Sequence, residues 1–173
     1  MHATCERCSR RIRIHNRRVI RCVCGHELSH KRFYGTSKPV YLLDANIFLY
    51  SHNVTPWVGS LCRRIFVEQH DGIATTDRVM DELPCLGGYY VIKVFDVKAL
   101  SEEVDAMRYD ELRPLSVADK SLIQCSIEHP EIAGIVTYDA DIRGVCPASL
   151  IKSDRPFFIG DALAFMKRMG MRK

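Results

Sequence analysis

From residue 40 onward, short apolar runs alternate with longer stretches in which apolar positions recur at a helical period. The apolar runs predict strands at residues 40–43, 72–75, 134–137 and 157–159, with a further β-rich stretch at 89–97. The amphipathic stretches predict helices at 45–50, 56–70, 77–83 and 116–129, and two more that begin at Ser101 and Asp161. Strands that alternate with helices indicate an α/β fold with a mostly parallel sheet and helices on both faces.

The predicted helix at 56–70 carries an apolar stripe. Its members, Trp57, Leu61, Ile65 and Phe66, recur at a helical spacing. This spacing is typical of a helix face that packs against a sheet, and we interpret the stripe as core. The alternative is an interface in a homodimer.

The longest apolar stretch, residues 40–50, does not predict a membrane span. It is interrupted by Asp44 and Asn46, whereas a bilayer requires about 20 apolar residues. The start of the chain also lacks the charged-then-apolar pattern of a signal peptide. We therefore expect a cytoplasmic location.

Four acidic residues lie where predicted strands end or near the ends of predicted helices: Asp44, Glu82, Asp119 and Asp139. Ligands of parallel sheets bind at the carboxyl ends of the strands, so we expect Asp44 and Asp139 to be neighbours there. Carboxylates gathered in one cleft repel one another unless a divalent cation lies among them. The chemistry that we expect of such a cluster is metal-dependent phosphodiester hydrolysis.

Each of these acids also has a purely structural interpretation. Asp44 can cap the helix that follows it, and Asp119 can complete a capping box begun by Ser116. Glu82 can be an exposed helix residue, and Asp139 can be a turn former. The occurrence of all four at element ends favours the cluster.

The first 38 residues differ in charge from the rest of the 173-residue chain. They hold ten Lys or Arg and two acids, a formal charge of +8, whereas residues 39–173 hold fifteen and nineteen, a charge of −4. We therefore expect a small basic module, 1–38, followed by a main domain, 39–173. A basic module suggests a polyanionic partner, and a solvated basic hairpin is the alternative. The arginines expected to contact nucleic acid are Arg10, Arg11, Arg13, Arg17, Arg18 and Arg21.

The basic module also contains two close pairs of cysteines, Cys5-x2-Cys8 and Cys22-x-Cys24. Two such pairs predict a tetrahedral structural Zn²⁺ with four thiolate ligands, as in a zinc ribbon. Because the second pair has one intervening residue, His26 or His30 could complete the shell in place of Cys22. Residues 11–14 and 17–21 predict a hairpin between the pairs. The other cysteines, which we interpret as buried thiols, are Cys62, Cys85, Cys125 and Cys146.

Four segments in this order resemble the successive signatures of PIN-domain nucleases: 42–46 (LLDAN), 75–83 (TTDRVMDEL), 115–119 (LSVAD) and 136–139 (VTYD). The similarity extends over residues 40–165. It implies a parallel five-stranded sheet flanked by helices and Mg²⁺- or Mn²⁺-dependent cleavage of single-stranded RNA. The acids that would bind the ion and form the catalytic site are Asp44, Glu82, Asp119 and Asp139. The residues that would support them are Asn46, Thr137 and Asp141.

The stretch 91–94 and the cysteine pairs are similar to one subgroup of this family, the endonucleases that mature the 3′ end of small-subunit ribosomal RNA. In that subgroup the zinc ribbon follows the PIN domain, whereas here it precedes the main domain. The resemblance implies ribosomal precursor RNA as a substrate. The alternatives are a toxin-type ribonuclease, a non-catalytic adaptor that binds RNA or protein, and a zinc-ribbon DNA-binding factor.

Overall fold

The computed structural model describes most of the main domain and part of the amino-terminal backbone. The described residues are 39–53, 56–84, 92–110, 113–146, 151 and 156–171, together with the backbone of four short strands before residue 39.

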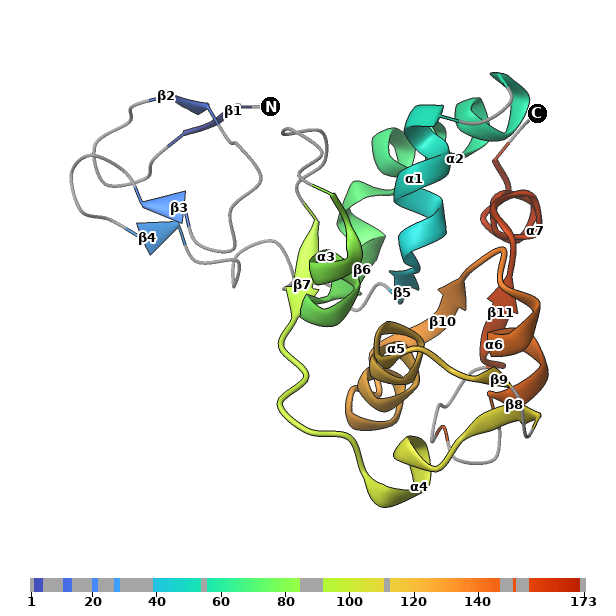
Figure 1. Ribbon diagram of the computed structural model, residues 1–173. Helices are drawn as coiled ribbons and strands as arrows, with labels where there is room; N and C mark the ends of the chain where they lie inside the picture. Colours follow the sequence, from blue (N-terminus) through green and yellow to red (C-terminus); the bar gives the residue numbers. More distant parts are fainter. Residues whose placement is uncertain are drawn as a thin grey trace.

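A five-stranded sheet forms the centre of the main domain (Figure 1). Its strands, in spatial order, are β11 (Phe158–Gly160), β10 (Ile132–Val136), β5 (Val40–Leu43), β6 (Ile73–Thr76) and β7 (Lys93–Phe95). All four neighbouring pairs are parallel. The prediction of an α/β fold with a parallel sheet is therefore confirmed.

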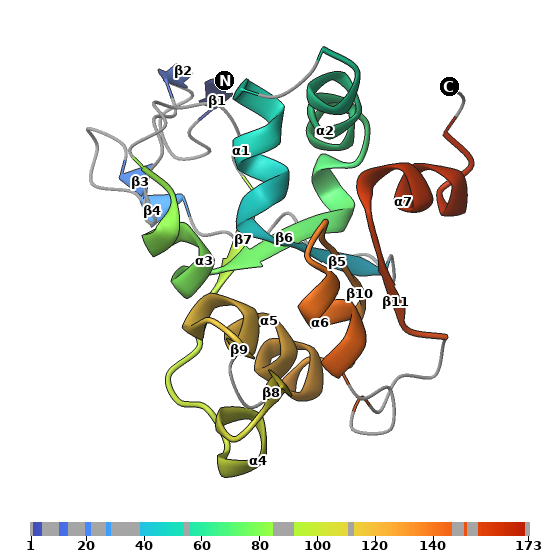
Figure 2. The same cartoon turned by 45° about the vertical axis from the view of Figure 1, so that its right-hand side comes forward.

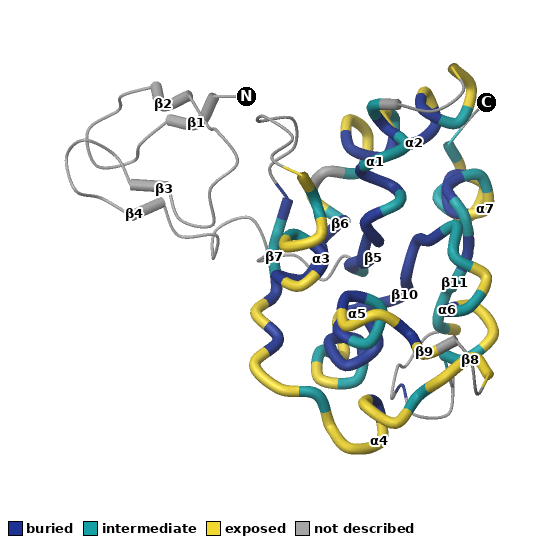
Figure 3. The backbone as a smooth tube through the Cα atoms, in the orientation of Figure 1, coloured by how far each residue is buried: buried dark blue, intermediate teal, exposed yellow. Residues whose placement is uncertain are grey.

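The three central strands, β5, β6 and β10, are buried along their whole length, whereas the edge strands β7 and β11 are only partly buried (Figure 3). A strand covered on both faces has no position for a polar alternation, so its sequence is a continuous apolar run. This is why strands could be predicted at 40–43 and 134–137; β5 has the predicted bounds, whereas β10 begins two residues earlier and ends one residue earlier.

Helices cover both faces of the sheet (Figure 2). The helices α1 (Ala45–Asn53), α2 (Pro56–Glu68) and α7 (Ala162–Arg168) lie on one side. The helices α4 (Glu102–Asp105), α5 (Val117–Glu128) and α6 (Ala140–Val145) lie on the other. The short α3 (Asp77–Glu82) follows β6 directly and packs against α5. A 3-10 turn, His70–Gly72, precedes β6.

The elements that were not predicted from the sequence include α6 and a small antiparallel hairpin of β8 (Arg108–Asp110) and β9 (Arg113–Pro114), which packs against α6. Gly144 of α6 lies directly under the ring of Tyr109, because a Cβ at this glycine would come within 2.8 Å of that ring.

The apolar stripe of α2 is core for three of its four members. Leu61, Ile65 and Phe66 are buried, whereas Trp57 is 58% exposed. The core interpretation is therefore wrong for Trp57, which lies in the first turn of α2.

In the amino-terminal segment, β1 (His2–Thr4) pairs with β2 (Arg11–Arg13), and β3 (Ile20–Arg21) pairs with β4 (Glu27–Leu28), both antiparallel. The prediction that 11–14 and 17–21 pair with each other is wrong. In the sequence, each cysteine pair instead lies between two strands that pair with each other. The cysteines themselves, and His26 and His30, lie outside the described residues, as do the side chains of the arginines named above.

Within the described part of the chain, no helix combines the length and the apolar character needed to cross a bilayer.

Candidate active site

The order of the strands identifies the place where a ligand crevice is expected. From β5 the chain proceeds outward to β6 and β7, then crosses to the other side of β5 to form β10 and β11. The direction therefore reverses between β5 and β10. In open α/β sheets, ligands bind outside the carboxyl ends of the strands at such a switch point.

Asp44 follows β5 at this point and is only 4% exposed. Its two carboxylate oxygens accept hydrogen bonds from three donors. Oδ1 accepts from the backbone N–H of Ala45, while Oδ2 accepts from Thr137 Oγ1 at 2.6 Å and from Asn46 Nδ2. Hydrogen bonds to both carboxylate oxygens thus hold the Asp44 side chain in one orientation.

The hydroxyl of Thr137 joins the ends of β5 and β10. It donates to Asp44 and accepts from the backbone N–H of Asp139 at 2.8 Å and from Asn46 Nδ2 at 3.2 Å. A hydroxyl has one donor and two lone pairs, so all of its capacity is used. Asn46 in turn accepts from the backbone N–H of Tyr138. The expected supporting residues Asn46 and Thr137 therefore connect Asp44 to Asp139.

Asp139 begins α6 and is half-buried. Its Oδ1 accepts from the backbone N–H of Asp141 at 2.6 Å, which caps the helix. The expectation that Asp44 and Asp139 are neighbours is confirmed, since one hydroxyl, that of Thr137, contacts both residues.

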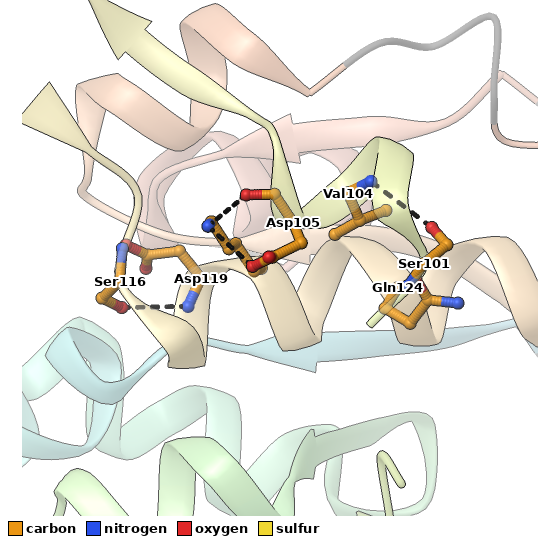
Figure 4. Close-up of polar contacts among 7 residues, drawn as sticks. Ser101, Val104, Asp105, Ser116, Asp119 and Gln124 are labelled. Atoms are coloured by element: carbon orange, nitrogen blue, oxygen red, sulfur yellow. Dashed lines mark hydrogen bonds and ion pairs between the residues drawn. The ribbon is translucent and has the colours of Figure 1, made fainter. Parts of the chain in front are cut away.

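Asp119 reaches the same region from the first turn of α5. It forms a capping box with Ser116: its backbone N–H donates to Ser116 Oγ at 3.1 Å, and its Oδ2 accepts from the backbone N–H of Ser116 at 3.0 Å (Figure 4). The structural interpretation of Asp119 is thus correct. It does not exclude a second role, because the helix end that is capped lies at the switch point.

Glu82 lies at the end of α3 and is exposed along most of its side chain. Its carboxyl group nevertheless lies close enough to Asp119 and to the Ser116 side chain for both to affect its pKa, Asp119 raising it and Ser116 lowering it. The position of α3 relative to α5 is fixed by a buried pair of hydroxyls, Thr76 and Ser121, whose oxygens are 2.6 Å apart. Ser116 therefore interacts with two of the acids, Asp119 and Glu82. From the sequence it was predicted only as a helix cap.

The four acids interact electrostatically. Burial raises the pKa of Asp44 from 3.8 to about 6, with the Thr137 hydrogen bond opposing it and the carboxylates of Asp119 and Asp139 adding to it. Burial also raises the pKa of Asp119, and so do the carboxylates of Asp139 and Asp141. The pKa of Glu82 is raised by desolvation of its carboxyl group and then by Asp119. Asp44, Glu82 and Asp119 thus each interact electrostatically with at least one other acid of the set, as expected.

The donor set at this site consists of carboxylates, which suit a hard cation such as Mg²⁺ or Mn²⁺. Among the described residues, however, no group of three or more His, Cys, Asp or Glu side chains is arranged to enclose a metal ion. Mg²⁺ usually keeps several waters and binds through one or two carboxylates. The residues therefore fit a hydrated ion rather than one enclosed by protein ligands.

Among the other cysteines, Cys62 and Cys125 are buried and Cys146 is half-buried, in keeping with their interpretation as thiols of the core, while Cys85 lies outside the described residues. The Cys62 thiol forms a hydrogen bond with the hydroxyl of Tyr138, so the Tyr138 side chain contacts α2.

Comparisons of this chain with protein-family models, with curated proteins and with solved structures gave no match.

Proposed function

We propose that this chain is a divalent-metal-dependent endoribonuclease with a PIN-like main domain, which hydrolyses phosphodiester bonds in single-stranded RNA. The observation that supports this most is the electrostatic interaction of Asp44, Asp119 and Asp139, which come from three separate segments, at the switch point of a parallel sheet. A parallel five-stranded sheet flanked by helices is compatible with a PIN-like fold.

In this proposal Asp44 and Asp139 hold the ion, and Glu82 and Asp119 bind it through water or hold a second one. A divalent ion there would supply an activated water and would offset the charge that develops on the phosphate. The protein's own contribution is to orient the ligands: Asn46 and Thr137 hold Asp44 through its Oδ2. Burial and the neighbouring carboxylates raise the pKa values of Asp44 and Asp119, so a cation held there would favour the ionised form of both.

The basic module, 1–38, would bind the RNA backbone in this proposal. Arginines at phosphates give affinity that falls with salt but carry no sequence information. A structural Zn²⁺ at Cys5, Cys8, Cys22 and Cys24 would fold the module. A closed shell of four thiolates leaves no position for a water, so we assign the zinc no part in cleavage. The resemblance described above favours ribosomal precursor RNA as the substrate.

The test is incubation of the purified chain with end-labelled RNA in Mn²⁺, in Mg²⁺ and in chelator, followed by mapping of the cut ends. We expect cleavage that requires a divalent ion and is abolished in Asp44→Asn, while binding of RNA persists. Wild-type cleavage by Asp44→Asn would refute the site.

The matched control is Asp77→Asn. Asp77 is also an aspartate directly after a central strand, and it is 7% exposed. Its Oδ1 accepts a hydrogen bond from the backbone N–H of Val97, a bond that an asparagine oxygen can also accept. We expect Asp77→Asn to cleave like the wild type, because the carboxyl group points to the segment after β7 and not to the acid cluster.

A non-catalytic adaptor is the second candidate, because the described acids do not enclose a metal ion. It predicts that the wild-type chain binds RNA but yields no metal-dependent product in the same assay.

A further inference from the structure

A cluster of carboxylates repels the phosphates of RNA as well as each other. A nuclease with such a site therefore needs positive charge at its rim that the acids do not neutralise. Among the basic residues that lie close in sequence to the acids are Lys120 and Arg143. Their contacts differ.

Lys120 is paired with an acid. Its Nζ donates to the backbone carbonyl and to Oδ1 of Asp105, the latter at 3.1 Å, and so its charge is directed toward α4. Asp105 and the Ser116–Asp119 capping box are both seen in Figure 4.

Arg143 is exposed, and among the described residues its hydrogen bonds go to main-chain carbonyls and not to a carboxylate. Its Nε donates to the carbonyl of Asp139 at 3.2 Å, and a terminal nitrogen lies 3.5 Å from the carbonyl of Tyr138. These contacts fix the guanidinium beside the segment that carries Asp139. A guanidinium has five N–H donors, so several remain for a phosphate.

An exposed aromatic ring packs on Gly144, the residue that follows Arg143 in α6. Tyr109 of β8 is 44% exposed, and its ring rests on Gly144, where a Cβ would come within 2.8 Å of it. The glycine therefore supports the ring closely from one side. The same hairpin ends at Pro114, two residues before Ser116, so its far end is joined to the segment that carries Asp119.

We propose that Arg143 and Tyr109 form a binding surface for the single-stranded RNA that flanks the cleaved bond. Arg143 would bind a backbone phosphate, and Tyr109 would stack on a base. The inference rests on the proposed function, because it takes its position from the acid cluster. Single-stranded RNA is the occupant that this pairing favours: a base can stack on an exposed aromatic ring, and a positive group on the neighbouring residue can hold the backbone.

The test measures RNA binding in the absence of added divalent ions, so that the RNA stays intact. The full chain is titrated into a fluorescein-labelled single-stranded RNA of mixed sequence, and the Kd is obtained by anisotropy at several salt concentrations. We expect Tyr109→Ala to raise the Kd roughly tenfold, since stacking on one aromatic contributes about 1–3 kcal/mol per base. Tyr109→Phe keeps the ring and should bind like the wild type.

Gly144→Ala tests the support beneath the ring. Its methyl group would displace Tyr109, so the Kd should rise as in Tyr109→Ala, and the double variant should bind no more weakly than Tyr109→Ala alone. Arg143→Gln should reduce the slope of log K against log salt by about 0.7, the value for one phosphate of a single strand. Circular dichroism melts establish that each variant is folded.

Matched controls come from the opposite side of the sheet. Trp57→Ala removes another exposed aromatic, and Arg64→Gln removes another arginine, both on α2; both should keep the Kd within twofold of the wild type. The inference is overturned if Tyr109→Ala and Arg143→Gln bind like the wild type, if the controls lose as much affinity, or if duplex DNA binds more tightly than the single strand.

The outcomes separate the two proposals. Loss of binding in these variants, with no metal-dependent cleavage by the wild type, would refute the nuclease proposal and support the RNA-binding surface. Cleavage that depends on Asp44, combined with unchanged binding by Tyr109→Ala and Arg143→Gln, would refute the surface and leave the nuclease.

Discussion

The buried carboxyl group of Asp44 should make the metal-free protein less stable at neutral pH than in mild acid. Its pKa is raised from 3.8 to about 6, chiefly because the folded chain removes it from water. The folded state therefore binds this proton more tightly than the unfolded state does. The stability that protonated Asp44 contributes is fully present below the unfolded pKa of 3.8 and is lost as the pH rises through about 6.

The size of the effect follows from the two pKa values. A shift from 3.8 to about 6 corresponds to roughly 3 kcal/mol at about 1.4 kcal/mol per pKa unit. About 2 kcal/mol of this is lost between about pH 4.5 and about pH 7.5, because the proton leaves the folded state mainly within that window. The residue is almost fully buried, so solvent screening reduces this figure little.

The assay is urea unfolding of the wild type and of Asp44→Asn at these two pH values, without divalent ions. Asparagine places an amide N–H₂ against hydrogen-bond donors, so the variant should be less stable at both. Its disadvantage should nevertheless shrink by about 2 kcal/mol on going to neutral pH, since only the wild type loses the contribution of the proton. Asp119 also loses a repelling neighbour in the variant, and this adds to the difference.

Mg²⁺ or Mn²⁺ added at neutral pH should raise the stability of the wild type and leave Asp44→Asn nearly unchanged, because a ligand stabilises only the state that binds it. An identical pH dependence of unfolding in the two proteins would show that Asp44 is not held in a desolvated position, and the electrostatic argument for the cluster would fail with it.

Three further substitutions test the surroundings of the site. Thr137→Val should lower stability by about 2–4 kcal/mol in thermal unfolding, since the hydroxyl that it removes serves Asp44, Asp139 and Asn46 at once; a loss under 1 kcal/mol would contradict the network. Ser116→Ala should cost about 1 kcal/mol through loss of the α5 cap, and an unchanged melting temperature would count against it. Gly134→Ala should destabilise by about 3 kcal/mol or more, because its Cβ would lie 2.4 Å from a backbone oxygen of the neighbouring strand, whereas Gly72→Ala, with its nearest contact at 3.5 Å, should be tolerated.

The central strands, and the closeness of the acids that follow two of them, were predictable from the sequence. The apolar runs of β5 and β10 are long enough to be identified, and Asp44 directly follows the first of them. That these acids meet required only the rule that ligands bind at the carboxyl ends of parallel strands. The capping box of Asp119 was likewise visible in its spacing from Ser116.

The parts that escaped prediction depend on contacts between distant segments. The helix α6 has six residues and includes Gly144, so its sequence shows no helical period. It packs against Tyr109, which lies 35 residues earlier in the sequence. The contact of Ser116 with Glu82 arises from the packing of α3 on α5. Trp57 follows the spacing of a core stripe but lies in the first turn of α2, where that face extends beyond the packed region.

Three of the four acids are tethered to main-chain amides of their own neighbourhoods: Asp44 to Ala45, Asp119 to Ser116 and Asp139 to Asp141. Rotating any of these side chains away would sacrifice a hydrogen bond, so the arrangement is preorganised before an ion arrives. If a divalent ion binds there as proposed, its binding should involve little reorganisation of these side chains and only a small heat-capacity change.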